Sequence, residues 1–276
     1  MSIQQLELAV LEGARRALGE GLPGAHRRVG QAVADHLPRH IEVEVFKGVR
    51  VPIDLQQAVQ RQSWWAGRRY EAPTIDVLRP WSAGASHFFD IGANYGFYAY
   101  FAAAHSGAEV YAFEPNPDLH RLMVGVKRAN GLARFHPQML GLSDEEATLP
   151  LHVCATDLGW STFGEHPDQW PVGTEASMTT FDAWLGHQGI VLPDRPAWVA
   201  KIDVEGFELR VLRGMRSALE AHAFRGLAVE LNEFTLRFCG ASTDDVTTLL
   251  EETGYREMTP GGRRANRSLN RFFVPV

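Results

Sequence analysis

Cysteine is scarce in this chain, with only Cys154 and Cys239 among its 276 residues. So few thiols exclude a framework of several disulfides and a zinc site built from four cysteines. We therefore expect a reducing, cytoplasmic setting, in which thiols stay reduced.

Long apolar runs and an excess of basic residues are also missing. No stretch approaches the roughly 20 consecutive apolar residues of a membrane-spanning helix. Residues 1–7 lack the basic leader and the apolar core of a signal peptide. With 27 Lys and Arg against 33 Asp and Glu, the net charge is −6. We expect neither a membrane span nor a nucleic-acid partner, because a mildly acidic chain is a poor match for a phosphate backbone.

The first 55 residues have a pattern of their own. Apolar residues recur at helical spacing over residues 3–18 and 29–37, and they alternate over residues 41–55 around Gly48, which is typical of a hairpin. We interpret residues 1–55 as an accessory region that packs on the main domain, mediates a homo-oligomer or covers the active site. Residues 56–276 then form the main domain.

From residue 87 onward, short apolar runs alternate with helical patterns. This alternation predicts an α/β fold with a mostly parallel sheet covered on both faces. The last two strands are close enough in sequence to pair as an antiparallel hairpin. The predicted strands are residues 87–91, 109–113, 135–142, 198–204, 226–231, 255–258 and 272–276, and the predicted helices are residues 98–105, 119–130, 209–223 and 246–253.

A glycine-containing turn follows the first predicted strand. It contains Asp90, Gly92, Asn94 and Gly96, and Glu114 ends the next strand. Open α/β sheets bind ligands at the carboxyl ends of their strands, and an acid in the position of Glu114 can accept hydrogen bonds from both ribose hydroxyls.

This turn differs from the dinucleotide fingerprint because its third glycine is missing and Asp90 precedes the glycines. A carboxylate there would repel a pyrophosphate, whereas it would attract an amino group and a cationic sulfur. S-adenosylmethionine has both features and no phosphate, so it is the predicted cofactor, and a dehydrogenase is disfavoured.

A second motif spans residues 198–208. Lys201 and Asp203 lie on one face of its strand because side chains alternate. A buried lysine needs a partner, and the next strand offers Glu230, so we predict an ion pair between Lys201 and Glu230. Asp203 and Asn232 would then face the ligand from the carboxyl ends of the two strands.

Together these segments resemble the FkbM family of S-adenosylmethionine-dependent methyltransferases, over roughly residues 70–275. The order of the segments agrees with the family, and the second motif has the form Lys-Ile-Asp-x-Glu-Gly. The matching segments are Tyr70-Glu71, residues 89–96, residues 112–116, residues 141–144, residues 179–182 and residues 201–206.

The resemblance implies a class I methyltransferase (Rossmann-like) fold, with seven strands and an antiparallel C-terminal edge strand. It places Asp90, Gly92, Ala93, Asn94 and Gly96 around the methionine part of the cofactor. Glu114 and Pro115 would hold the ribose, and Ser143 and Asp144 would lie near the adenine. Known members mostly methylate hydroxyl groups of sugars, lipid-linked glycans and natural products.

Hydroxyl methylation requires removal of a proton, and several residues could accept it. The candidates are Asp203, Glu205 and a nearby histidine, of which His166 lies in the irregular segment of residues 154–178. Alternatively, Asp203 and Asn232 could hold Mg²⁺, which would acidify the hydroxyl. We take Asp203, Glu205, Lys201 and Glu230 as the catalytic set.

Two other functions stay open, a cofactor-binding module without turnover and an N-methyltransferase. The second usually ends its fourth strand with Asn/Asp-Pro-Pro-aromatic, where this chain has Asp203-Val204-Glu205-Gly206. A cluster of arginines could contact phosphates or form a solvated turn, and four tryptophans could stack on an acceptor ring or be buried. These residues are Arg263, Arg264, Arg267 and Arg271, and Trp64, Trp65, Trp160 and Trp170.

Overall fold

The computed structural model describes residues 39–154, 158–164, 171–259 and 269–276. The helices predicted over residues 3–18 and 29–37 lie outside these ranges. No described helix is long and apolar enough to cross a bilayer.

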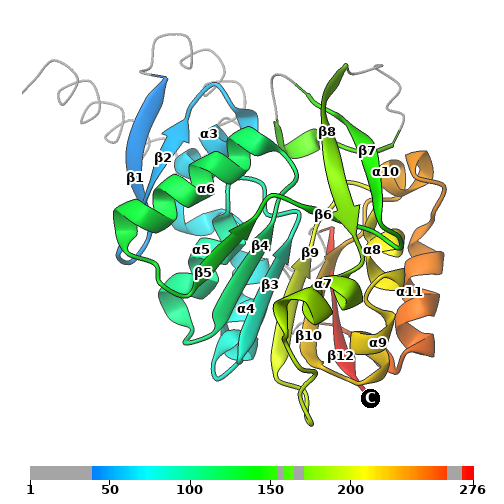
Figure 1. Ribbon diagram of the computed structural model, residues 1–276. Coiled ribbons are helices and arrows are strands. Elements are labelled where there is room, and N and C mark those ends of the chain that lie inside the picture. Colours follow the sequence, from blue (N-terminus) through cyan, green and yellow to red (C-terminus); the bar gives the residue numbers. More distant parts are fainter. Residues whose placement is uncertain (1–38, 155–157, 165–170, 260–268) are drawn as a thin grey trace, which may run out of the picture.

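A seven-stranded sheet forms the centre of the molecule, in the order β11-β12-β10-β9-β3-β4-β5 (Figure 1). The pairs among β10, β9, β3, β4 and β5 are parallel, whereas β12 is antiparallel to both β10 and β11. The predicted class I methyltransferase sheet is thus confirmed, with β12 inserted just inside the outermost strand. The bounds are β3 (His87–Ile91), β4 (Glu109–Phe113), β5 (Phe135–Gln138), β9 (Trp198–Ile202), β10 (Phe224–Glu230), β11 (Tyr255–Met258) and β12 (Asn270–Pro275).

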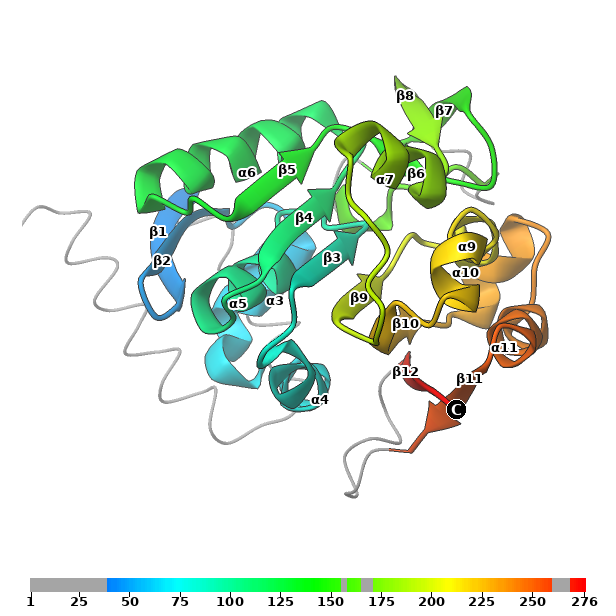
Figure 2. The ribbon, with the colours of Figure 1, turned by 60° about the horizontal axis from the view of Figure 1, so that its bottom comes forward.

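Helices cover both faces of this sheet (Figure 2). Side chains alternate along each strand, so Phe88 packs into the core on one face and Phe89 into the core on the other. One face carries α4 (Ala72–Ser82), α5 (Phe97–His105) and α6 (Pro117–Asn130). The other carries α7 (Phe181–Gln188), α8 (Glu208–Arg213), α9 (Arg216–Glu220) and α11 (Thr243–Glu252), and α10 (Glu233–Phe238) follows β10.

The predicted N-terminal hairpin is present as β1 (His40–Phe46) and β2 (Val49–Asp54). It packs on α5, where the ring of Phe46 lies 5.1 Å from Phe97 and 5.7 Å from Phe101. Then follow α3 (Ala58–Ala66) and a short 3-10 helix, η1 (Gly67–Arg69). Trp64 and Trp65 of α3 are buried in the same core, so stacking on an acceptor is wrong for both. The domain division at residue 55 stays a prediction.

A second, three-stranded sheet was not predicted. It consists of β6 (Gly141–Leu142), β8 (Val172–Thr179) and β7 (Ala147–His152), with η2 (Leu158–Trp160) between β7 and β8. The predicted strand 135–142 is therefore divided between two sheets, and the last third of the predicted loop 154–178 is β8. The strand is hard to recognise in the sequence because none of its first four residues is buried and only residues 175–178 alternate between exposed and buried.

The predicted helix over residues 209–223 is divided into α8 and α9 around Gly214. A Cβ at Gly214 would lie 2.0 Å from the backbone oxygen of Ser143, so the chain needs a glycine here for close packing. The break brings α9 beside α7, where Asp182 accepts hydrogen bonds from the backbone of Ser217 and Ala218.

Candidate active site

A cavity of about 240 Å³ opens at the carboxyl ends of β3, β4, β9 and β10. Its walls come from the glycine-containing turn after β3, the end of β4, the turn after β9, the end of β10, the segment before α4 and residues 158–163. The two sequence motifs therefore contribute to one cavity, as a site at the carboxyl edge of an α/β sheet requires.

The turn after β3 is fixed by backbone hydrogen bonds. Gly92 and Ala93 donate their N–H groups to the oxygen of Phe113, and Asn94 donates to Glu114 Oε2 at 2.9 Å. Gly92 has a φ of 80°, and a Cβ there would lie 1.8 Å from the backbone oxygen of Asp203. Gly92 is thus required by the close approach of the chain after β9, a reason that the sequence did not reveal.

Asp90 lies beneath this turn and is not part of the cavity wall. Its side chain is buried, and Oδ2 accepts a hydrogen bond from the N–H of Ala99 in α5 at 2.8 Å. Burial raises the pKa of Asp90 to about 7, although the charge of Lys201 opposes the shift. The carboxylate that was predicted to attract the cofactor is therefore covered by the turn.

Glu114, in contrast, reaches the cavity at the end of β4. Its two carboxylate oxygens accept hydrogen bonds from the N–H groups of Asn94 and Asn116, at 2.9 and 2.8 Å. Burial raises the pKa of Glu114 to about 7, and these two bonds oppose the shift. Each oxygen keeps a lone pair for a hydroxyl of a ligand.

Ser143 and Asp144 lie behind the cavity, whereas the preceding Leu142 is part of its wall. Ser143 donates its hydroxyl to Asp144 Oδ1 at 3.1 Å. Asp144 in turn pairs with Arg210 of α8 at 3.2 Å. These contacts connect β6 to α8.

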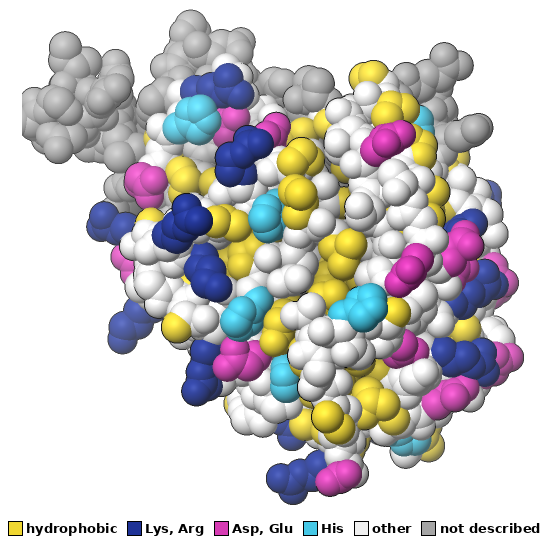
Figure 3. Space-filling view, in the orientation of Figure 1, with side chains coloured by type: hydrophobic (Ala, Val, Ile, Leu, Met, Phe, Trp, Pro, Cys, Tyr) yellow, Lys and Arg dark blue, Asp and Glu magenta, His cyan; other side chains and the backbone are white. Residues whose placement is uncertain are grey.

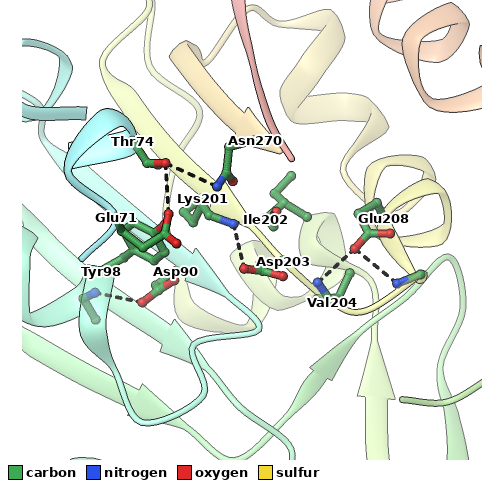
Figure 4. A network of polar contacts seen from close by, with 12 residues as sticks. Glu71, Thr74, Asp90, Tyr98, Lys201, Ile202, Asp203, Val204, Glu208 and Asn270 are labelled. Carbon is green, nitrogen blue, oxygen red and sulfur yellow. Dashed lines mark hydrogen bonds and ion pairs between the residues drawn. The ribbon is translucent and has the colours of Figure 1, made fainter. Parts of the chain in front are cut away.

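Lys201 is fully buried, and its ammonium pairs with Asp203 at 3.0 Å (Figure 4). The predicted partner, Glu230, is wrong for the direct contact, because the parallel register places Ala228 beside Lys201. Burial lowers the pKa of Lys201, but the charges of Asp203 and Glu230 outweigh this effect and the pKa is raised. Glu230 thus lies near Lys201 without forming a direct ion pair with it.

The turn after β9 presents Glu205 to the cavity in a left-handed backbone conformation, with φ of 48°. The hydroxyl of Thr162 donates to the backbone carbonyl oxygen of Glu205 at 2.9 Å. The carboxylate oxygen Oε1 of Glu208 accepts hydrogen bonds from the backbone N–H groups of Val204 and Gly206. Burial, and then the charge of Asp203, raise the pKa of Glu205 well above its ordinary value. Backbone strain held by such contacts is typical of functional sites.

Glu230 completes the acidic wall at the end of β10. The charge of Asp203, followed by burial, raises the pKa of Glu230 to about 9, and the two side chains share a hydrogen bond. Asp203, Glu205 and Glu230, with the buried Lys201 behind them, are therefore brought together as predicted.

The structure does not support the predicted magnesium site. Within the described residues, no three His, Cys, Asp or Glu side chains are arranged to hold a metal ion. Asp203 is paired with Lys201, and the Asn232 side chain accepts from the N–H of Phe234 to cap α10. Asp203 and Asn232 therefore do not fit a divalent cation.

Histidines contribute nothing to the cavity wall in the part of the chain that the structure describes. His136, for example, pairs with Glu109 at the amino end of β4, whereas the cavity lies at the carboxyl end. His166 lies outside the described residues, as do Trp170 and the side chain of Trp160. A histidine base is thus left without support among the described residues.

The basic cluster near the C-terminus is described only in part. Arg271 forms two hydrogen bonds to Glu257, at 2.7 and 2.6 Å, whereas Arg263, Arg264 and Arg267 lie outside the described ranges. Acidic and basic side chains are interspersed on the face shown in Figure 3. Arg271 is thus engaged within its own hairpin.

Tyr70, Glu71 and Tyr98 are among the cavity residues that were missed as site residues in the sequence. The pair Tyr70-Glu71 did belong to the resemblance, but nothing in the sequence indicated its role. Tyr98 lies on α5, and the packing of α4 on α5 brings its hydroxyl within 2.8 Å of Glu71.

Known proteins resemble this chain in sequence. The sequence profile described as the methyltransferase FkbM domain matches residues 90–257. The hexuronic acid methyltransferase AglP of Haloferax volcanii is 34% identical over 192 residues, which are 67% of this chain and 69% of that protein.

The solved structures that match the chain share little sequence with it. A SAM-dependent methyltransferase of Agrobacterium tumefaciens is 12% identical with a TM-score of 0.44, covering 87% of this chain and 70% of its own. TYW2 of M. jannaschii, solved in complex with AdoMet, is 12% identical with a TM-score of 0.41, covering 86% and 87%.

Proposed function

The chain belongs to the FkbM methyltransferase family, and from this premise we propose that it transfers the methyl group of S-adenosylmethionine to a hydroxyl of a sugar or glycoside. The observation that carries the proposal is that one cavity is shared by Glu114 on one side and by Asp203 and Glu205 on the other. The relative named a hexuronic acid methyltransferase supports a sugar as the acceptor.

The residues of the turn after β3 fit the cofactor. Gly92, Ala93, Asn94 and Gly96 would surround its methionine part, with Asp90 supporting the turn from beneath. Glu114 would accept hydrogen bonds from the ribose hydroxyls, next to Pro115. Leu142 would contact the adenine, and Ser143 and Asp144 would hold this wall from behind.

When bound, the cofactor supplies a methyl group on a cationic sulfur, already activated for displacement. The protein must then align an acceptor oxygen behind that carbon, so that the new C–O bond forms in line with the breaking C–S bond. We assign this alignment to the wall opposite Glu114.

Glu205 is our candidate for the general base. It reaches the cavity from a turn that Thr162 and Glu208 hold in place, and it would take the hydroxyl proton as the C–O bond forms. Its raised pKa makes the ionised form a stronger base than an ordinary carboxylate.

Lys201, Asp203 and Glu230 would position the acceptor. Lys201 holds the Asp203 carboxylate in place through the 3.0 Å ion pair, so Asp203 can accept a hydrogen bond from a second acceptor hydroxyl. Glu230, with its pKa raised to about 9, shares a hydrogen bond with Asp203 and would orient the Asp203 carboxylate toward the acceptor.

A methyl-transfer assay with a panel of acceptors tests the proposal. The purified chain is incubated with S-adenosylmethionine and neutral hexopyranosides, hexuronates and aromatic glycosides, and mass spectrometry identifies the methylated product. We expect an ether on a sugar hydroxyl, absent with Glu205→Gln. A product methylated only on nitrogen would contradict the proposal.

A further inference from the structure

Glu71 presents a carboxylate to the cavity from outside the segment that matches the family profile, which begins at residue 90. It is the N-cap residue of α4 and has a left-handed backbone conformation, with φ of 50°. An N-cap side chain usually accepts a hydrogen bond from its own helix backbone, but that of Glu71 does not. Glu71 is instead one of the residues that line the cavity.

Two donors hold this carboxylate, one from its own helix α4 and one from the neighbouring helix α5 (Figure 4). Tyr98 of α5 donates its hydroxyl to Glu71 Oε2 at 2.8 Å, and Thr74 of α4 donates to the same oxygen at 3.2 Å. Asn270 of β12 donates to the Thr74 hydroxyl at 3.2 Å, which fixes the direction of the Thr74 proton. Glu71 is thus positioned by three elements.

Both of these hydrogen bonds end on Oε2. In the described part of the chain, no donor reaches Oε1, and this oxygen is not among the buried atoms that lack a partner. Oε1 is therefore an available acceptor on a residue of the cavity wall. The nearest buried ammonium, Lys201, is paired with Asp203.

The other carboxylates near the turn after β3 are already engaged. Asp90 is buried beneath the turn and holds Ala99. Glu114 bonds two backbone N–H groups at the opposite end of the cavity. The cofactor proposed above carries an α-ammonium group that needs an acceptor when it leaves water, because a buried charge without a partner is costly.

We infer that Glu71 binds the α-ammonium group of S-adenosylmethionine through Oε1, the role that the sequence suggested for Asp90. The inference rests on the proposed function for the identity of the cofactor. Tyr98, Thr74 and Asn270 act as positioning residues that orient the Glu71 carboxylate before the ligand arrives.

Calorimetric binding of two ligands tests the inference without an acceptor. The ligands are S-adenosylhomocysteine and its desamino analogue, which lacks only the α-ammonium group. We expect Glu71→Gln to weaken the first by about tenfold or more, since a hydrogen bond between charged groups is lost. The affinity for the desamino analogue should stay within about twofold.

Matched variants make the outcome specific. Glu251→Gln removes an exposed carboxylate from α11 and should change neither affinity, and Asp90→Asn should affect both ligands to a similar degree. Equal affinities of Glu71→Gln and wild type for S-adenosylhomocysteine would overturn the inference, as would a selective loss in Asp90→Asn. If the wild type binds neither ligand, the proposed function fails. If the wild type binds S-adenosylhomocysteine and Glu71→Gln binds it equally well, only the inference about Glu71 fails.

Discussion

The backbone oxygen of Asp203 occupies the place where Gly92 would carry a Cβ, at 1.8 Å from its ideal position. Gly92 belongs to the turn after β3 and Asp203 follows β9, so the turn proposed to bind the cofactor and the turn proposed to act on the acceptor are in van der Waals contact. The N–H of Asp203 also donates to the oxygen of Ile91 at 2.9 Å. The two motifs are therefore built as one unit.

Gly92→Ala tests this contact. The new methyl group must displace the backbone after β9, and the φ of 80° disfavours any residue with a Cβ. We expect a loss of about 2–4 kcal/mol in the free energy of unfolding, measured by urea denaturation, together with loss of S-adenosylhomocysteine binding. Gly125→Ala, where a Cβ meets nothing within 4 Å, is the control. An unchanged Gly92→Ala variant would refute the contact.

Lys201→Met tests the buried ion pair. The variant leaves Asp203 without its cation next to Glu205 and Glu230, so we expect a loss of about 2–3 kcal/mol, moderated because Asp203 is partly exposed. Arg121→Met breaks an exposed pair with Asp118 and should cost about 0.5 kcal/mol or less. If both variants melt like the wild type, the pair does not stabilise the fold.

Asp90 makes stability depend on pH. Its pKa rises to about 7 in the folded protein. At pH values between the pKa of the unfolded state and about 7, the folded state therefore binds more protons than the unfolded state. Stability from this group is therefore present below the unfolded pKa and decreases as the pH rises through about 7. Asp90→Asn should flatten the decrease in denaturation midpoints between pH 5 and pH 8. A slope equal to that of the wild type contradicts the raised pKa.

Glu205 should control the pH dependence of methyl transfer. A base with a raised pKa is protonated at low pH, so kcat/KM should increase with pH, with a midpoint above the pKa of an ordinary carboxylate. Glu205→Gln should lower kcat by about 100-fold or more and remove that increase, with little change in the affinity for S-adenosylhomocysteine. A variant that keeps the wild-type profile would assign the proton to another group.

Thr162 should act on the reaction through Glu205. Thr162→Val removes the 2.9 Å hydrogen bond to the backbone carbonyl oxygen of Glu205, which helps to hold the turn, and should lower kcat about fivefold. The KM for the cofactor should stay unchanged, and Thr247→Val on α11, whose hydroxyl bonds only the exposed helix backbone, serves as the control. A change confined to the KM for the cofactor would mean that Thr162 acts on cofactor binding and not on Glu205.

The sequence predicted those features that depend on local pattern. The bounds of β3 and β4 agree with the structure because apolar runs in a covered parallel sheet are continuous and end at polar turns. The ion pair of Lys201 was assigned to the wrong residue because strand register is set by packing between strands. Glu71 could not be found because its position depends on how α4 packs on α5.

The most direct test of the account is the thermal stability of the wild type with S-adenosylhomocysteine, with NAD⁺ as the control. A ligand at 100 times its dissociation constant stabilises by about 2.7 kcal/mol. The account predicts this stabilisation for S-adenosylhomocysteine alone and its loss in Glu114→Ala. Stabilisation by NAD⁺ without any by S-adenosylhomocysteine would contradict it.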